Sequence, residues 1–314
     1  MCDDTTEAEN DQLAKPQLGR REVVHLGLGA VAAVALPGCT GGAARSHVEN
    51  PDDGARSATP SASAHAPSPK TASRRVIITT PDGKADAFFV TPGEGKAAAV
   101  ILWPDVAGLR GAYETMGTRL AEQGYAVLVV NQYYRSAVAP VLESFAEWRT
   151  EEGKAKLKPM MKALTSEATT RDAGAFVGWL DAQPEVDTQR KIGSVGYCMG
   201  GPFTVRTAAA APTRVGAAAS FHGGGLATGE PDSPHLSIAK TRASFLFAIA
   251  KNDDERDAEA KVKLRAAADA AQRAAEIEVF PAQHGWCTID SPVYDEEQAG
   301  RAWARMLELF KTAL

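Results

Sequence analysis

The chain has 314 residues, of which 44% are hydrophobic and 23% are charged, and its net charge at pH 7 is −5. This is an ordinary globular composition, and an acidic chain with no basic run among aromatic residues is not expected to bind nucleic acid. The four cysteines form neither a metal-ligand spacing nor a dense disulfide framework, so we expect no metal and no cofactor.

Residues 1–39 have the pattern of a bacterial export signal. The pair Arg20-Arg21 precedes an apolar run over 23–36, which is too short to span a membrane but has the length of a signal-peptide core. Twin arginines at this place are typical of export in the folded state. At the end of this run, Leu36-Pro37-Gly38-Cys39 is similar to a lipobox, so Cys39 is the expected lipidation site of a periplasmic or cell-surface protein. A short buried helix is the alternative interpretation of this segment.

Residues 40–73 are rich in Ser, Ala, Pro and Gly and hold almost no large apolar side chain. Such a segment cannot bury enough surface to offset the entropy lost on ordering. The composition therefore predicts a disordered tether over 40–73, followed by one folded domain over 74–314.

The folded part is predicted to alternate strands with helices after an opening hairpin. Residues 132–164 are irregular and charged, and we expect them to form an excursion over the sheet. The alternation favours an α/β fold with a mostly parallel, doubly wound sheet and an N-terminal antiparallel hairpin. Strands are expected over 74–80, 85–90, 97–103, 125–130, 191–195, 215–221, 244–250 and 277–280. Helices are expected around 113–120, 173–180, 202–211 and 258–274, and after the N-cap Asp295.

A nucleophile elbow is predicted at the end of the strand over 191–195. The sequence Gly196-Tyr197-Cys198-Met199-Gly200 has the Gly-x-Cys-x-Gly pattern and leads into a helix of small residues. The turn is so tight that its central side chain is forced outward and bulky neighbours would collide, hence the glycines. The N-terminus of the following helix favours a thiolate at Cys198. A buried structural cysteine is the alternative, because free cysteines are usually of that kind.

An acyl-transfer nucleophile also needs a base and an acid that orients it, and in this fold class both follow the nucleophile along the chain. Asp253 and His284 come after two successive strands, at the same sheet edge as Cys198. Asp253 could instead belong to a solvated acidic loop, and His284 could be an ordinary loop histidine. His222 follows the wrong strand to be the base.

Taken together, these motifs resemble the dienelactone hydrolase family of the α/β-hydrolase fold. The combination is more specific than any one motif, and it covers the chain from about Arg74 to the C-terminus. The segments that carry the likeness are 195–201, Asn252-Asp253, His284-Gly285-Trp286, 103–109 and 123–128.

The resemblance implies a catalytic triad of Cys198, His284 and Asp253. It also implies an oxyanion hole made by the backbone N–H group of Met199 and one near Val106. The predicted function is hydrolysis of a small ester or lactone through a thioester on Cys198.

The sequence departs from the family pattern at two positions. Asp105 stands where the family has a glutamate that holds the resting thiol, and aspartate is one methylene shorter. We keep Asp105 as an expected site residue, since a buried strand-end carboxylate is costly without a partner; the shorter side chain leaves open whether it reaches and activates Cys198. Thr288 replaces an arginine that grips the substrate carboxylate, which disfavours dienelactone itself. Arg110 and Arg135 could substitute for it.

Tyr197 and Trp286 are further expected substrate contacts beside the triad residues. Cys287 follows the expected base by three residues and could form a disulfide with Cys198, which would silence the nucleophile. We expect Cys287 to be a packed core thiol instead.

The expected partner is a small ester or lactone, taken up by a monomer that meets a membrane only through a lipid on Cys39. The alternative function is a non-catalytic, lipid-anchored protein that binds a small hydrophobic carboxylate or ester in the same pocket. A thiol redox enzyme is disfavoured because the chain has no Cys-x-x-Cys, and a metal enzyme because no His/Asp/Glu cluster has ligand spacing.

Overall fold

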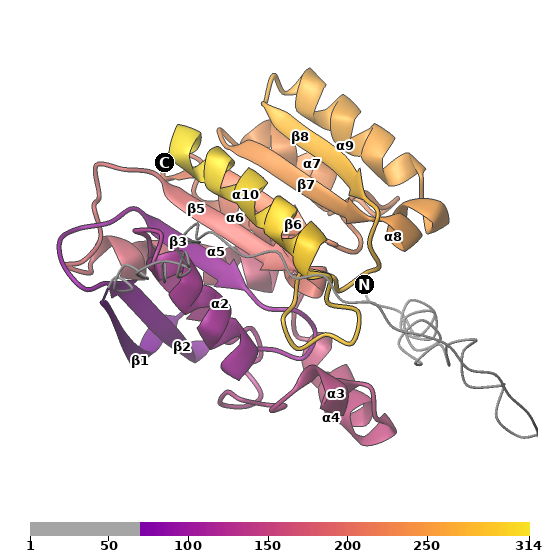
Figure 1. Ribbon diagram of the computed structural model, residues 1–314. Helices are drawn as coiled ribbons and strands as arrows, with labels where there is room; N and C mark the ends of the chain where they lie inside the picture. The colour runs from indigo at the N-terminus through magenta and orange to yellow at the C-terminus, as the bar shows by residue number, and fades with distance from the viewer. Residues whose placement is uncertain (1–69) are drawn as a thin grey trace, which may run out of the picture. The chain divides into compact units, whose positions relative to one another are not determined.

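The computed structural model describes residues 70–314, which are built around an eight-stranded sheet (Figure 1). The expected signal segment, most of the expected tether and Cys39 lie outside the described residues. The strands are β1 (Thr71–Thr80), β2 (Gly83–Pro92), β3 (Ala99–Trp103), β4 (Ala126–Val130), β5 (Ile192–Tyr197), β6 (Val215–Phe221), β7 (Ser244–Ala250) and β8 (Ala275–Phe280). The helices are α2 (Gly111–Ala121), α3 (Phe145–Trp148), α4 (Glu151–Met161), α5 (Ser166–Asp181), η1 (Cys198–Gly200), α6 (Gly201–Ala210), α7 (Pro234–Ser237), η2 (Ile238–Lys240), α8 (Lys251–Arg256), α9 (Glu259–Ala270) and α10 (Glu296–Ala313).

The sheet has the order β1-β2-β4-β3-β5-β6-β7-β8. The first three strands in this order pair antiparallel, and β4, β3 and β5 to β8 pair parallel. The predicted mostly parallel sheet with an N-terminal hairpin is therefore confirmed. Strand β1 begins at Thr71 rather than at residue 74, because Thr71 to Ser73 continue the pairing with β2 as far as Pro92.

Helices cover both faces of the sheet, so the inner strands are buried on two sides. On one face α5, α6 and α9 contribute Phe176, Phe203 and Leu264 to one hydrophobic core. On the other face α2 and α10 contribute Met116 and Met306 to a second core. All residues of β3 and β4 are buried, which explains their uninterrupted apolar sequences.

The excursion after β4 contains two helices that the sequence did not suggest, α3 and α4. Helix α4 is capped by Thr150, whose Oγ1 accepts from the backbone N–H of Gly153 at 3.0 Å. Along α4 only Gly153 and Leu157 are buried, so the apolar periodicity that marks a core helix is too weak to recognise. The excursion lies to one side of the sheet, as Figure 1 shows.

The C-terminal half agrees closely with the expected pattern. Strands β6 and β7 match the predicted ranges, and α10 is capped by Asp295, which accepts from the N–H of Gln298 at 3.0 Å. One difference matters for the site: Asp253 lies in the first turn of a short helix, α8, rather than in a loop.

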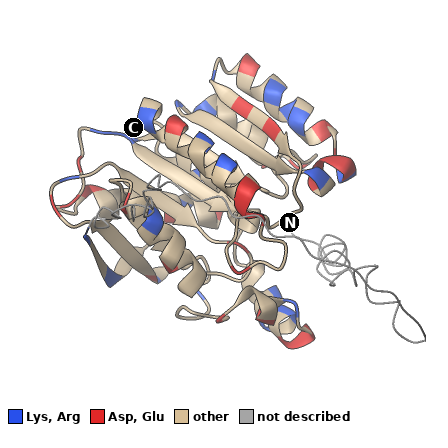
Figure 2. Cartoon of the chain, viewed as in Figure 1, with Lys and Arg blue, Asp and Glu red and all other residues tan. Residues whose placement is uncertain are grey.

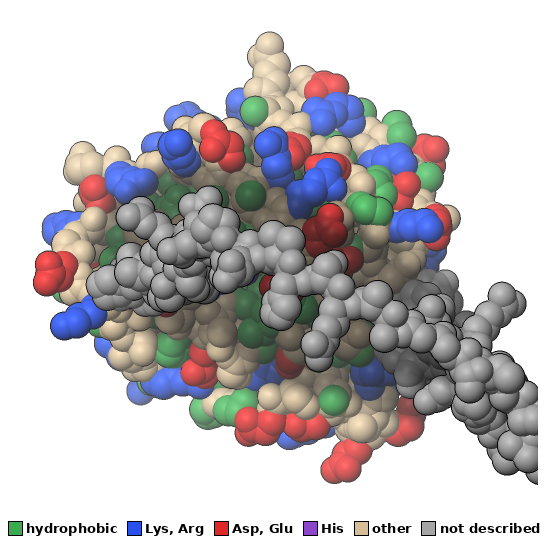
Figure 3. Space-filling model, in the orientation of Figure 1, with side chains coloured by type: hydrophobic (Ala, Val, Ile, Leu, Met, Phe, Trp, Pro, Cys, Tyr) green, Lys and Arg blue, Asp and Glu red, His purple; other side chains and the backbone are tan. Residues whose placement is uncertain are grey.

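Charged residues of both signs are interspersed over the outer helices, whereas β5 and β6 carry none (Figure 2). In the space-filling view, hydrophobic side chains are visible toward the centre of the same face, inside a rim of mixed charge (Figure 3). Among the described helices, none combines the length and the apolar character that crossing a membrane requires.

The topology gathers several loops at one edge of the sheet. From β3 the chain proceeds to β4 on one side and returns to β5 on the other, so the strand order reverses at β3. Ligands of open α/β sheets bind at such a reversal, outside the carboxyl ends of the strands. The loops after β3, β5, β6, β7 and β8 are therefore where the functional residues are to be sought.

Candidate active site

The turn at Cys198 has the geometry of a nucleophile elbow. Cys198 has a φ of +51° and its side chain is buried. A Cβ on Gly196 would lie 2.2 Å from the carbonyl oxygen of Gly200, and one on Gly200 would lie 2.4 Å from that of Trp103. Because backbone meets backbone at both places, only glycine fits, and the turn is pressed against the end of β3.

His284 and Asp253, which the sequence places after β8 and β7, form a hydrogen-bonded pair. The His284 Nδ1 is 2.6 Å from Asp253 Oδ2, and the backbone N–H of His284 donates to Asn252 Oδ1 at 2.8 Å. Two consecutive residues of α8 thus hold the histidine by its ring and by its backbone. A carboxylate beside Nδ1 favours the tautomer that carries its proton on that nitrogen.

His222, set aside in the sequence analysis, lies between the elbow and the pair. Its Nδ1 accepts from the backbone N–H of Cys198 at 3.1 Å. Its ring centroid is 4.9 Å from that of His284 and 5.2 Å from that of Trp286. One buried imidazole therefore contacts both Cys198 and His284. The signal in the sequence was a histidine at a strand end, followed by Gly223 and two further glycines.

The protonation state of His222 follows from its surroundings. Burial and the neighbouring His284 lower the pKa of His222 well below its usual value. Since its Nδ1 accepts a hydrogen bond, the single proton of the neutral ring is on Nε2, which has no hydrogen-bond partner among the described residues. His222 is thus arranged as a neutral positioning residue rather than as a base.

The free energy of unfolding should depend on pH through His222. Below about pH 6.5 the unfolded chain protonates this histidine while the folded chain keeps it neutral, so stability is lost as the pH falls. The expected loss from this group is at most about 1.4 kcal/mol per pH unit. Urea unfolding of the wild type and of His222→Gln, at about pH 7.5 and about pH 5.5, measures it. Equal pH dependence in the two proteins would contradict the prediction.

Arg110, an expected substrate-binding residue, is instead a fully buried cross-link. Its Nη1 and Nη2 donate to the two carboxylate oxygens of Asp105 at 2.8 and 3.0 Å. Its Nε and Nη2 donate to Asp290 at 2.8 and 2.6 Å, and Nη1 also donates to the carbonyl of Gly108. All five N–H groups of the guanidinium are therefore used inside the protein, and none is available to a substrate.

Asp105 has a different partner from the expected thiol. Both of its carboxylate oxygens accept from Arg110, and Oδ1 also accepts from the N–H of Ala107 at 2.9 Å. Burial opposes the charge of Arg110, but Asp105 and Asp290 outweigh it and raise the pKa of the guanidinium. Burial alone would raise the pKa of Asp290, and the hydrogen bond and charge of Arg110 lower it. This cluster holds the loop after β3 to the loop after β8.

Removing the buried cation should be strongly destabilising. In Arg110→Met, Asp105 would remain buried without its counter-charge, and the expected loss is about 3–5 kcal/mol of unfolding free energy. The matched control is Arg75→Met, which breaks the exposed pair with Glu114 and should cost less than about 1 kcal/mol. Chemical denaturation of both variants measures the difference, and similar losses would contradict the assignment.

The other expected substrate contacts point away from the elbow. Arg135 binds Asp82 and Asp172, with N–O distances of 2.6 and 2.8 Å. Tyr197 precedes Cys198 and therefore points to the opposite face of the sheet, where it stacks on Phe221 with the ring centroids 5.1 Å apart.

Trp286 is fully buried and stacks on Phe280, with the ring centroids 5.3 Å apart. Cys287 is a free, buried thiol whose pKa is raised by burial. The expectation of a packed thiol is confirmed, and a disulfide between Cys287 and Cys198 is not present.

The two expected oxyanion residues are linked by Tyr133, which the sequence analysis did not single out. The hydroxyl of Tyr133 donates to the carbonyl of Val106 at 2.7 Å and lies 3.8 Å from the sulfur of Met199. Burial raises the pKa of Tyr133, so the phenol stays protonated. The loop after β3 and the residue after Cys198 are thus brought side by side.

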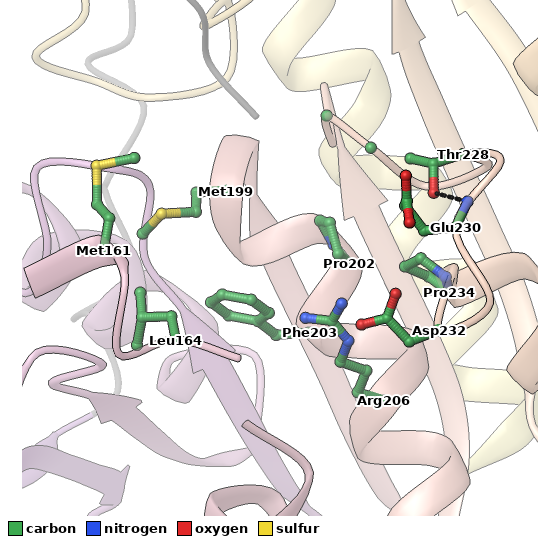
Figure 4. Close-up of a pocket in the computed structure, with 12 residues that line it drawn as sticks. Met161, Leu164, Met199, Pro202, Phe203, Arg206, Thr228, Glu230, Asp232 and Pro234 are labelled. Atoms are coloured by element: carbon green, nitrogen blue, oxygen red, sulfur yellow. Dashed lines mark hydrogen bonds between the residues drawn. The ribbon is translucent and has the colours of Figure 1, made fainter. Parts of the chain in front are cut away.

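Two cavities border the glycine-rich loop after β6. One has a volume of about 270 Å³ and is lined by Met199, by apolar residues of α4, α6 and α7, and by the charged residues Arg206, Glu230 and Asp232 (Figure 4). The other, of about 380 Å³, is lined by His284, Asp253 and charged residues of α8 and α9. Gly224, Gly225 and Thr228 belong to the walls of both. Within residues 70–314 there is no cluster of His, Cys, Asp and Glu side chains that could hold a metal ion.

Comparison with known proteins decides the family. The family model described as the dienelactone hydrolase family matches residues 85–314. The chain belongs to this family. The match begins within β2, so the hydrolase family region contains the elbow, the His284–Asp253 pair and both cavities, while β1 precedes it.

Relatives of this dienelactone hydrolase-like hydrolase include named enzymes. A Synechocystis protein, provisionally named a carboxymethylenebutenolidase, is 26% identical over 224 residues, which cover 70% of this chain and 88% of that protein. The carboxymethylenebutenolidase of Rhodococcus opacus is 25% identical over 224 residues, covering 70% of this chain and 83% of that enzyme. A crystal structure from Klebsiella pneumoniae, provisionally named a dienelactone hydrolase, has a TM-score of 0.67 at 22% identity and covers 77% of this chain and 99% of its own.

Proposed function

We propose that this protein hydrolyses small esters or lactones through a covalent thioester on Cys198. The observation that carries the proposal is the short contact between His284 Nδ1 and Asp253 Oδ2, 2.6 Å, beside a strained cysteine elbow. A carboxylate that holds one imidazole nitrogen orients the other to exchange protons with a nucleophile and a leaving group. His222 contacts both the elbow, at the backbone of Cys198, and the ring of His284.

The proposed reaction has two steps. In the reduced protein, Cys198 gives its thiol proton to Nε2 of His284, and the resulting thiolate attacks the acyl carbon. The backbone N–H groups of Met199 and Val106 stabilise the negative oxygen. The carbon–oxygen bond to the leaving group breaks, His284 protonates the departing alkoxide, and a thioester remains. His284 then takes a proton from water, whose hydroxide releases the acid and restores the thiolate. Asp253 keeps the imidazole in the useful tautomer throughout.

The substrate class is proposed from the names of the relatives and from the replacement of one family arginine by a threonine. Two relatives carry the name carboxymethylenebutenolidase, which supports a lactone or ester as the substrate. At the position of the family's carboxylate-gripping arginine stands Thr288, which is buried and lies 3.3 Å from the hydroxyl of Tyr113. Because this position holds no cation, we propose a neutral ester or lactone rather than dienelactone.

Variants of the three proposed catalytic residues should lose ester hydrolysis to different extents. Under reducing conditions, Cys198→Ala should reduce turnover of p-nitrophenyl acetate to the background rate. His284→Ala and Asp253→Asn should lower kcat by about 100- to 10,000-fold, the usual contribution of a positioned acid–base group. Steady-state kinetics measures all three.

The matched control is Cys287→Ala, since this thiol is buried away from the elbow and should keep activity within a few-fold. Equal rates in Cys198→Ala and the wild type would contradict the thioester mechanism. If Cys198 also reacted with iodoacetamide no faster than free cysteine, the non-catalytic binding protein would be favoured instead.

We also propose that the protein is exported by the twin-arginine route and anchored through Cys39 outside the cytoplasm. The support is the Arg20-Arg21 pair before the apolar run over 23–36. Mass spectrometry of the protein purified from its native membrane fraction should find an N-terminus at Cys39 that carries a lipid. An intact Met1 on protein recovered in the soluble fraction would contradict export.

A further inference from the structure

We propose that the cavity beside Met199 binds a straight aliphatic acyl chain, so that the preferred substrates are esters of short to medium fatty acids. The inference assumes the ester hydrolysis proposed above and specifies its substrate. It assigns a role to a cavity of about 270 Å³ that none of the proposed catalytic steps uses.

The position of the cavity ties it to the acyl side of the reaction. Met199 directly follows Cys198 and its side chain forms part of the cavity wall. A thioester on Cys198 would therefore form at the residue next to a wall of this cavity, and the chain attached to its carbonyl carbon is assigned to the cavity on that ground. The leaving group must instead reach His284, which lines the other cavity.

The walls next to Met199 are apolar. Met161 and Leu164 come from the end of α4 and the turn that follows it, and Phe203 comes from α6. Figure 4 shows these three side chains grouped on the same side of the cavity as Met199. Burying methylene groups of a ligand against this surface lowers the free energy of binding, whereas a hydroxyl or amide would find no hydrogen-bond partner there.

The opposite side of the cavity is charged, and this limits how long the chain can be. Arg206, Glu230 and Asp232 line it, and Figure 4 shows the Arg206 guanidinium beside the Asp232 carboxylate. Burial lowers the pKa of Arg206, and the charge of Asp232 opposes that shift. With two carboxylates near one guanidinium, this side does not favour a second carboxylate on the substrate.

The test varies the acyl chain while the leaving group is constant. The kcat/KM for p-nitrophenyl acetate, butyrate and hexanoate should rise by about fourfold for each added methylene until the chain reaches the charged side, and octanoate should add little. Met161→Trp fills the apolar side and should lower the hexanoate-to-acetate ratio of kcat/KM by at least about tenfold. The matched control Lys162→Trp places the same indole on the neighbouring exposed position and should leave the ratio as in the wild type. Leu164→Trp serves as a second variant if Met161→Trp does not fold.

Each contrary result has a defined meaning. A flat acyl series in an active enzyme overturns the acyl-chain assignment but leaves the hydrolase standing. The same conclusion follows if kcat/KM rises along an alcohol series, from methyl to hexyl acetate, and not along the acyl series. It also follows if p-nitrophenyl hydrogen succinate has a higher kcat/KM than p-nitrophenyl butyrate. Absence of turnover for every ester overturns the hydrolase and this assignment together.

Discussion

The site depends on direct contact between the backbone of the elbow and the end of β3. The carbonyl oxygens of Gly200 and Trp103 occupy the space that side chains on Gly196 and Gly200 would need. This contact lets Cys198 adopt a φ of +51° and sit at the carboxyl edge of the sheet, where the loop with Val106 also arrives. A larger residue at Gly200 would push the elbow from β3, and one at Gly196 would clash inside the turn with the carbonyl of Gly200, so either change would displace Cys198. The position of Cys198 is therefore set by the central sheet.

A second constraint is the buried charge at Arg110. Taking a guanidinium and a carboxylate out of water costs several kcal/mol per ion, and the geometry must recover this through hydrogen bonds. All five N–H groups of Arg110 are paired, and Asp290 also accepts from the backbone N–H of Phe145 at 3.0 Å. One side chain thus connects the loop after β3, the loop after β8 that carries His284, and helix α3 of the excursion. The guanidinium that the sequence suggested for substrate binding instead holds two loops and helix α3 together.

The sequence predicted the strands better than it predicted the roles of charged residues. Strands β6 and β7 are uninterrupted apolar runs between polar residues, so their bounds were found, whereas α4 buries little more than Leu157 and was missed. Asp253 and His284 could be paired in advance because parallel strands bring their ends together. The roles of the charged residues could not be predicted because they depend on burial. The sequence shows that Arg110 is charged but does not show that it is fully buried. His222 was set aside as a base because it follows the wrong strand, and that rule says nothing about a histidine that accepts from the backbone N–H of Cys198.

The two edges of the sheet bear on how this protein behaves at high concentration. Edge strand β1 exposes Arg74 and Arg75, and edge strand β8 carries Glu276 and Glu278, which bind arginines of α10. Charged side chains on an edge strand oppose the addition of a strand from another molecule, because they would have to give up water or their own partners. Both open edges are thus protected against the edge-to-edge growth that leads to aggregation, which a molecule with so apolar a sheet interior would otherwise risk during folding.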